Sequence, residues 1–256
     1  MLLAIDVGNT NTVLGVYEGR RLLDHWRLET NPHRSDDEYG ILLRQLLEHA
    51  RIDVTKVRAV AVSSVVPPMQ RSLEKMSRRY FNAPPMFVGP GVKTGMPILC
   101  DNPREVGADR VVNSVAAYEK VKGALIVVDF GTALTFDAVS AKGEYLGGSI
   151  CPGVAISMEA LVQHASKLPR VELARPPHVV GRNTVHSMQS GLVFGYVSLV
   201  DGLCARMQAE MGLSVRVLAT GDLAPLVASE SRAIHEVDEF LTLDGLRIIH
   251  ERNHAP

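Results

Sequence analysis

The spacing of apolar positions predicts that the first half of the chain begins with strands and continues with helices. Alternating or unbroken apolar runs bounded by turn residues are typical of strands, and apolar residues three and four apart are typical of helices. These patterns predict strands at 2–7, 12–17, 21–29, 58–66 and 85–88, and helices at 36–51, 69–81 and from about 103. The last helix has a start signal, because Asn102 can cap it and Glu105 lies three residues later.

The second half shows the same order of strands before helices. The patterns predict strands at 124–130, onward to about 150, and at 214–219, and helices at 184–211 and 242–251. The Pro-rich stretch 168–178 has no regular pattern and is predicted to be a loop.

Strands followed by helices in both halves predict an α/β fold with two domains and a cleft between them. We expect the domains at 1–115 and 116–256. No low-complexity linker marks the boundary, which therefore extends over 115–123.

The composition is that of a folded, nearly neutral protein. Apolar residues make up 46% of the 256 residues, enough for a sizeable core, which excludes a disordered chain. The net charge is −1 and no long charged block occurs, so neither nucleic acid nor a charged membrane surface is expected as the main partner. An acid at residue 6 comes too early for a signal peptide, and no run approaches the ~18 apolar residues of a membrane span. We expect a cytoplasmic protein, and three widely spaced cysteines fit a reducing compartment.

A short motif occurs once in each half, as AIDVGNTNTVLGV at 4–16 and VVDFGTALTFDAV at 127–139. Aligned without a gap, the copies share an acid, a glycine and a threonine: Asp6 and Asp129, Gly8 and Gly131, Thr12 and Thr135. In each copy an apolar run ends in the acid and turns on the glycine. Two such turns facing each other could hold a polyphosphate and its metal, so nucleotide chemistry is the leading hypothesis.

The first turn is the richer in hydrogen-bond donors. Gly8 permits close approach of the backbone to a ligand, and Asn9, Thr10, Asn11 and Thr12 add side-chain donors. An acid at the strand end, Asp6, can hold Mg²⁺ through water. An ordinary hairpin turn contains the same residue types, and the second copy favours the functional interpretation. The turn lacks the lysine of a Walker motif.

The segment GADR at 107–110 could bind the acceptor. It falls inside the predicted helix, where glycine costs about 1 kcal/mol against alanine, so Gly107 indicates a close contact. Asp109 could accept a hydroxyl proton, and Arg110 could hold a carboxylate by a two-pronged contact. An acid and a base on a solvated helix face would give the same pattern.

Two further features are weaker. The sequence TGD at 220–222 follows a strand, where the base or ribose of a nucleotide could lie, but a plain strand–helix turn explains it as well. His164, His178 and His186 form no metal-binding motif.

Taken together, the motifs resemble type III pantothenate kinase over nearly the whole chain and in the family's order. The segments that carry the resemblance are DVGNTNT, SSVVPP at 63–68, DNPREVGADR at 101–110, DFGTALTFD at 129–137, GEYLGGSICPG at 143–153 and GRNTVHSMQSG at 181–191. The resemblance implies two related actin-like/sugar-kinase/Hsp70 (ribonuclease H-like) ATPase domains and a homodimer. It also implies ATP-dependent phosphorylation of the 4′-hydroxyl of pantothenate, the first step of coenzyme A biosynthesis.

The resemblance also implies roles for individual residues. The ATP-binding residues would be Asp6, Val7, Gly8, Asn9, Thr10, Asn11, Thr12, Val13 and Thr132. Asp6 would help to place Mg²⁺, and Asp129 would bind a monovalent cation, K⁺ or NH₄⁺. The pantothenate-binding residues would be Cys100, Gly107, Ala108, Asp109, Arg110 and Thr184. Asp109 would be the proton acceptor, and Thr184 would reach the substrate from the partner subunit.

The sequence departs from the family pattern at two positions. Cys100 stands where the family usually has tyrosine, and Asp222 stands where a glycine is common. These departures suggest an alternative, a weakened or inactive homologue that serves as a binding or regulatory protein. A sugar kinase of the same fold is a third reading, which Arg110 disfavours because its guanidinium matches a carboxylate.

Overall fold

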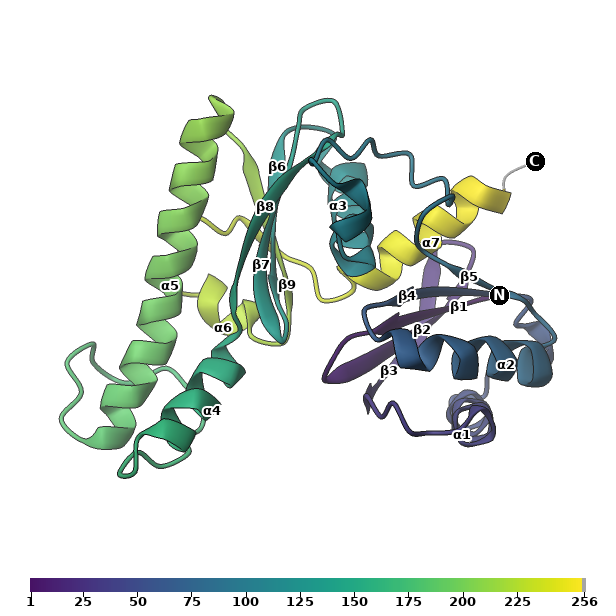
Figure 1. Cartoon of the computed structure of the whole chain (residues 1–256), viewed down its shortest axis with the longest axis horizontal. Coiled ribbons are helices and arrows are strands. Elements are labelled where there is room, and N and C mark those ends of the chain that lie inside the picture. The colour runs from purple at the N-terminus through teal and green to yellow at the C-terminus, as the bar shows by residue number, and fades with distance from the viewer. Residues whose placement is uncertain (255–256) are drawn as a thin grey trace. The chain divides into compact units, whose positions relative to one another are not determined.

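The computed structural model describes residues 1–254, and the chain packs into two compact units (Figure 1). Unit 1 contains Met1–Gly95, Asn102–Ala116 and the C-terminal residues from Leu241, and unit 2 contains Met96–Asp101 and Ala117–Phe240. The expected division at 115–116 stays a prediction about functional domains. The packing units differ from it in the short segment before residue 102 and in the C-terminal helix.

Unit 1 is built on a five-stranded mixed sheet with the order β3-β2-β1-β4-β5. The strands are β1 Leu2–Val7, β2 Asn11–Glu18, β3 Arg21–Glu29, β4 Ala59–Ser64 and β5 Pro85–Phe87. β1 pairs antiparallel with β2 and parallel with β4. The motif turn therefore joins two central strands, where neighbours on both sides hold it.

Two helices cover one face of this sheet, α1 Asp36–His49 and α2 Gln70–Phe81. α1 begins with a capping box, because Ser35 accepts from the Glu38 N–H while Glu38 accepts from the Ser35 N–H. The buried core joins alternate residues of β1 and β2 to these helices, which is the period-two pattern of a strand with one face on a core. On the other face lies α7 Leu241–His254, and a Cβ on Gly15 would lie only 2.8 Å from the Leu243 side chain.

Unit 2 has a five-stranded sheet of the order β10-β9-β6-β7-β8. The strands are β6 Leu125–Phe130, β7 Ala133–Val139, β8 Tyr145–Pro152, β9 Arg216–Gly221 and β10 Glu236–Val237. The helices are α4 Val154–His164, the long α5 Thr184–Met211 and the short α6 Ala224–Ala228. Apolar residues of β6, β7 and β9 form the core with α5 and α6.

The two sheets have one topology. In each, the strand that carries the motif acid next to its last residue pairs antiparallel with the strand after the turn and parallel with a later strand. The order β3-β2-β1-β4-β5 in unit 1 corresponds strand by strand to β8-β7-β6-β9-β10 in unit 2. The sequence repeat therefore marks two units of related architecture, as predicted.

The helix expected from about residue 103 is wrong at its start. The segment Pro103–Glu105 forms the 3₁₀ helix η3, and α3 Ala108–Val121 begins only after Val106 and Gly107. Asn102 does act as a cap, but of η3, by accepting from the Arg104 N–H at 3.3 Å. The helix α4 was not expected from the sequence, whereas the short α6 begins just after 220–222, where a strand–helix turn was considered.

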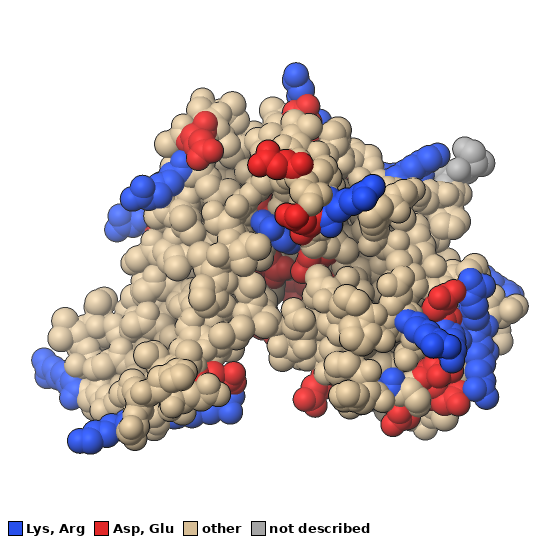
Figure 2. Space-filling model, viewed as in Figure 1, with Lys and Arg blue, Asp and Glu red and all other residues tan. Residues whose placement is uncertain are grey.

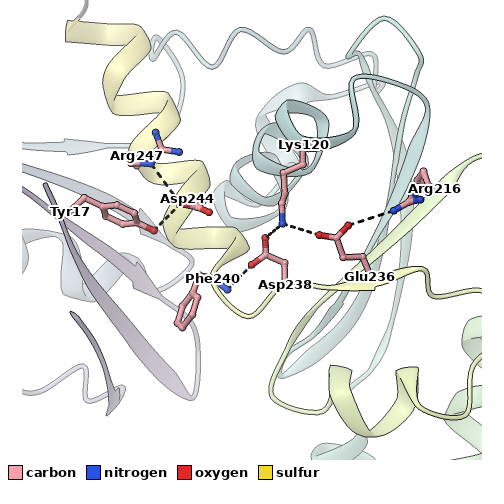
Figure 3. A network of polar contacts seen from close by, with 8 residues as sticks. All are labelled: Tyr17, Lys120, Arg216, Glu236, Asp238, Phe240, Asp244 and Arg247. Carbon is pink, nitrogen blue, oxygen red and sulfur yellow. Dashed lines mark hydrogen bonds and ion pairs between the residues drawn. The ribbon is translucent and has the colours of Figure 1, made fainter. Parts of the chain in front are cut away.

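Polar contacts join helices α3 and α7 to neighbouring strands and loops (Figure 3). In unit 2, Lys120 at the end of α3 bridges Asp238 at 2.6 Å and Glu236 at 3.0 Å. In unit 1, Tyr17 of β2 donates to Asp244 of α7 at 3.0 Å. Because these side chains are partly exposed, each ion pair contributes modestly to stability, about 0–1 kcal/mol.

The surface carries both signs of charge in mixture, and Figure 2 shows no large patch of one sign on the face in view. In the described part of the chain, one helix, α5, is long and apolar enough to cross a membrane by length and composition alone. The expectation that no run approaches a membrane span was therefore too strong for this segment. Buried residues of α5 pack into the core of unit 2, and the core helix of a globular protein meets the same criterion.

Candidate functional site

The first motif turn is a short loop braced by the end of β3. Gly8 N–H donates to the Asn11 carbonyl at 3.0 Å, and a Cβ on Gly8 would lie 3.0 Å from the same oxygen. Thr30 donates its hydroxyl proton to the Gly8 carbonyl at 2.8 Å and pairs with the Thr12 hydroxyl at 2.9 Å. The hydroxyl of Thr12 is therefore used to hold the turn, while Asn9 and Thr10 are exposed at its tip.

The two turns differ in length by one residue, which corrects the ungapped alignment. β1 and β2 are separated by residues 8–10, whereas β6 and β7 are separated only by 131–132. Consequently Asp6 lies opposite Val13, whereas Asp129 lies opposite Thr135. The structural counterpart of Thr135 is Val13, not Thr12.

Asp6 and Asp109 form an electrostatically coupled pair within unit 1. Asp6 is the penultimate residue of β1, and Asp109 lies in the first turn of α3. Burial, and then the negative charge of Asp109, raise the pKa of Asp6 to about 7. Burial also raises the pKa of Asp109, against the opposing effects of the Arg110 N–H and guanidinium. A buried carboxylate that also feels the negative charge of a second carboxylate favours a bound proton or a cation.

The start of α3 sets the position of Asp109. The Asp109 Oδ1 accepts from the Arg110 N–H at 2.8 Å. A Cβ on Gly107 would lie 2.4 Å from that Oδ1, so a side chain at this position would displace the carboxylate. Gly107 lies just before the helix and not inside it as predicted. The close contact predicted for Gly107 does exist, and the group that lies close to it is the Asp109 carboxylate. Ala108 is the first residue of the helix and, like Arg110, is partly exposed.

The second turn is packed between two glycines that sequence reasoning left without a role. Gly153 donates to the Thr132 carbonyl at 3.0 Å, and a Cβ there would lie 2.3 Å from that oxygen. Gly221, at φ +94°, lies against Phe130, where a Cβ would be 2.6 Å from the carbonyl oxygen. Both lie in quoted motifs, GEYLGGSICPG and TGD, but their part in the turn shows only from the packing.

Cys100 lies in unit 2, next to β8. The segment before it continues the sheet, because Leu99 N–H donates to the Tyr145 carbonyl at 2.8 Å and Tyr145 N–H donates to the Pro97 carbonyl at 2.8 Å. The Cys100 Sγ would be 3.8 Å from a Cβ on Gly147. The predicted substrate residues are thus divided, with GADR in unit 1 and Cys100 and Thr184 in unit 2.

Thr184 is the first residue of α5, whose N-cap Asn183 accepts from the His186 N–H at 2.8 Å. It lines an open hollow of about 450 Å³ with apolar neighbours that include Leu161 and Met188. The side chain of Thr184 is exposed. The hollow contains no residue of the second motif turn.

The described residues contain no group of three or more His, Cys, Asp or Glu side chains suited to a metal ion. An HExxH pattern does occur at 250–254 on α7, which sequence analysis passed over. Its two imidazole rings stack at 4.1 Å, its Glu251 pairs with Arg247 at 2.9 Å, and the Nε2 of His250 is buried. This pattern is therefore part of the helix packing.

Solved structures share this architecture. A protein from Sinorhizobium meliloti assigned as a 2-dehydro-3-deoxygalactonokinase matches with a TM-score of 0.60 at 11% identity, over 100% of this chain and 98% of that one. The polyphosphate/ATP-glucomannokinase of Arthrobacter sp. strain KM matches with a TM-score of 0.52 at 11% identity, over 98% of both chains. At such identity these structures show the fold alone. The chain has the two-domain α/β fold of actin-like and sugar-kinase ATPases, as predicted.

Sequence comparison then gives the family. A profile of type III pantothenate kinase matches residues 2–206. A type III pantothenate kinase of Myxococcus xanthus (strain DK1622) is 76% identical over 255 residues, which cover 100% of both chains. The protein belongs to the type III pantothenate kinase family, which confirms the resemblance identified from the motifs.

Proposed function

We propose that this protein is an ATP-dependent kinase that phosphorylates the 4′-hydroxyl of pantothenate, the first step of coenzyme A biosynthesis. Family membership supports the reaction, and the observation that carries its mechanism is the coupled pair Asp6 and Asp109 in unit 1. One carboxylate can serve a cation and the other the acceptor hydroxyl. The comparisons do not favour the inactive alternative that the departures at Cys100 and Asp222 suggested.

Asp109 is the proton acceptor in this proposal. Phosphoryl transfer depends on positioning and on charge stabilisation, and a primary alcohol needs one base. Burial raises the pKa of Asp109 and makes its carboxylate a stronger base than an exposed one. Arg110, the next residue, would hold the carboxylate of pantothenate, while Gly107 and Ala108 line the approach.

The turn of residues 6–13 would bind the ATP phosphates, with the exposed Asn9 and Thr10 at its tip. Asp6 would hold Mg²⁺ through water. Its raised pKa supports this assignment, because a charged carboxylate there is costly until a cation compensates it. When bound, the metal neutralises charge that develops on the β- and γ-phosphates.

The second turn would support the terminal phosphate. Thr132 would contact ATP, and Asp129 would bind K⁺ or NH₄⁺. The register supports a cation at Asp129, because hydroxyl side chains lie opposite it on both sides, Thr135 on β7 and Thr220 on β9. Oxygen atoms are the ligands that alkali cations prefer.

The same proposal includes a homodimer in the cytoplasm. Thr184 would reach pantothenate of the partner subunit, and Cys100 would also contact pantothenate. Exposed glycines on α5, among them Gly191 and Gly195, would let a second copy of this helix approach closely. All three cysteines are free thiols, which suits a reducing compartment.

The experiment that tests the function measures ADP formation with ATP, Mg²⁺ and K⁺, with pantothenate or a panel of sugars as the acceptor. We expect turnover only with pantothenate. Asp109→Asn should lower kcat by about 10²–10⁴-fold while ATP binding survives. Asp101→Asn is the matched control, because Asp101 is an exposed acid of the same segment. Normal turnover of Asp109→Asn would refute the assigned base, and turnover of a sugar in place of pantothenate would refute the substrate.

A further inference from the structure

A fully buried carboxylate, Asp137, lies two residues beyond Thr135 on β7. Its exposed fraction is 0%. The Tyr145 hydroxyl donates to its Oδ1 at 2.6 Å, and the Thr135 hydroxyl donates to its Oδ2 at 3.3 Å. A buried charge is stable only when hydrogen bonds or partners compensate it, so this arrangement is built into the fold.

Asp137 shares a face of the sheet with Asp129. Residues two apart on a strand point to the same face, and residues directly opposite on antiparallel strands do so as well. Asp129 lies opposite Thr135, so Asp129, Thr135 and Asp137 all lie on the face turned away from the α5 core. The polar contacts thus run from Tyr145 through Asp137 to the hydroxyl beside Asp129.

The direction of the Thr135–Asp137 hydrogen bond decides whether the Thr135 hydroxyl is a donor or an acceptor toward the Asp129 side. A threonine hydroxyl has one proton and two lone pairs. Because the proton is given to Asp137, only lone pairs are left toward the Asp129 side. Lone pairs next to a carboxylate repel it unless a cation or a donor lies between them.

The first unit lacks this arrangement. The residues that correspond in register to Thr135 and Asp137 are Val13 and Gly15. Gly15 packs against Leu243 of α7, so an apolar contact takes the place of a carboxylate at this position. The polar pair is therefore specific to the second unit and does not follow from the shared topology.

We infer that Asp137 and Tyr145 are positioning residues that hold the Thr135 hydroxyl as an acceptor, so that Thr135 is an oxygen ligand of the monovalent cation at Asp129. The inference rests on the cation proposed above and adds a ligand to it, together with the residues that orient that ligand. Asp137 itself does not touch the cation; it acts through Thr135.

Thr135→Val tests the inference, because it removes the hydroxyl and keeps a β-branched side chain. The K⁺ concentration for half-maximal activity should rise about tenfold, which corresponds to about 1.4 kcal/mol for one lost ligand. The kcat at saturating K⁺ and the KM for ATP should stay within about twofold, and Thr135→Ser should restore K⁺ affinity. Ser140→Ala is the matched control, because Ser140 gives its hydroxyl proton to Glu144 at 2.7 Å in the β7–β8 hairpin.

A second measurement follows binding without turnover. The K⁺-dependent rise in Tm of the enzyme with MgADP, compared with Na⁺ at equal ionic strength, should be reduced in Thr135→Val and in Asp137→Asn. Tyr145→Phe should reduce it less, because the Thr135–Asp137 bond remains. Asp137→Asn can fail to fold, and Thr135→Val then decides the outcome.

The outcomes separate this inference from the proposed function. Loss of the K⁺ response in Asp129→Asn with a wild-type response in Thr135→Val would overturn only the role of Thr135 and Asp137. Wild-type enzyme that phosphorylates pantothenate without any response to K⁺ or NH₄⁺ would overturn the cation site and this inference together, but not the kinase.

Discussion

The carboxylate of Asp109 occupies the space that a side chain on Gly107 would need. A Cβ on Gly107 would lie 2.4 Å from the Asp109 Oδ1, which also accepts from the Arg110 N–H at 2.8 Å. The last residue before α3 therefore fixes the orientation of the proposed base in the first turn of the helix. The role of Gly107 is therefore to leave space for the Asp109 Oδ1.

Gly107→Ala should displace the Asp109 carboxylate and slow the chemical step. We expect kcat to fall about 10–100-fold, because a misplacement of about 1 Å can cost that much, with little change in the KM for ATP. The measurement is steady-state kinetics with both substrates varied. Gly123→Ala is the control, because the nearest atom to its added Cβ lies 3.8 Å away. Unchanged kcat in Gly107→Ala would contradict the positioning role.

The raised pKa of Asp6 predicts how the stability of the ligand-free protein depends on pH. The folded pKa is about 7 and the unfolded value is about 3.9, so the folded state binds the proton more tightly. The stability that Asp6 contributes is complete below about pH 4 and is lost as the pH rises through about 7. Asp6→Asn, which cannot ionise, should therefore raise the Tm at pH 8 relative to wild type and change it little at pH 4.

Asp53→Asn is a control of opposite sign for this titration. Hydrogen bonds from Thr55 lower the pKa of Asp53, so its contribution to stability is present above the unfolded pKa and is lost as the pH falls. Thermal unfolding across the pH range checks both variants. An Asp6→Asn curve parallel to wild type between pH 4 and 8 would show that Asp6 does not titrate there.

Most of the secondary structure could be predicted because its signals are local. The strands β1 and β3 and the helix α5 have the predicted bounds, since apolar periodicity and caps mark them in the sequence. The start of α3 could not be predicted, because the Asn102 cap signal is the same for a 3₁₀ helix that ends within one turn. The strand register at the two turns could not be predicted either. The turns differ in length by one residue, and this difference shows only in the pairing of the strands.

The candidate site could be predicted less completely than the fold. The motif acids were found because each ends an apolar run and recurs in the other half. Gly153 and Gly221 were missed, because their contacts are with the backbone of a turn far away in the sequence. Asp137 lay within a quoted motif, but its burial and its bond to Tyr145 depend on the pairing of β7 with β8.

Cys100→Tyr should strengthen pantothenate binding, because it restores the side chain that the family usually has there. Cys100 lies beside Gly147, at φ +123°, where little side-chain bulk opposes a larger ring. An aromatic contact is worth about 0.5–1.5 kcal/mol, so the KM for pantothenate should fall about two- to tenfold with kcat unchanged. Cys100→Ala, as the control, should give no such gain. An unchanged KM in Cys100→Tyr would place Cys100 outside the substrate site.

Substitutions at Gly195 on α5 test whether the protein is a dimer. Gly195 is exposed, and an added Cβ would meet nothing within 4 Å in a single chain. In a monomer, Gly195→Ala should raise the free energy of unfolding by about 1 kcal/mol, because alanine favours the helix.

In a dimer packed through this face, the larger Gly195→Leu should instead dissociate the subunits and lower activity, since Thr184 would no longer reach the partner's substrate. Gln208→Leu, an exposed α5 position roughly 140° around the helix axis, is the control. Sedimentation velocity at several protein concentrations decides between the monomer and the dimer. A wild-type protein that is monomeric and fully active would contradict the shared site.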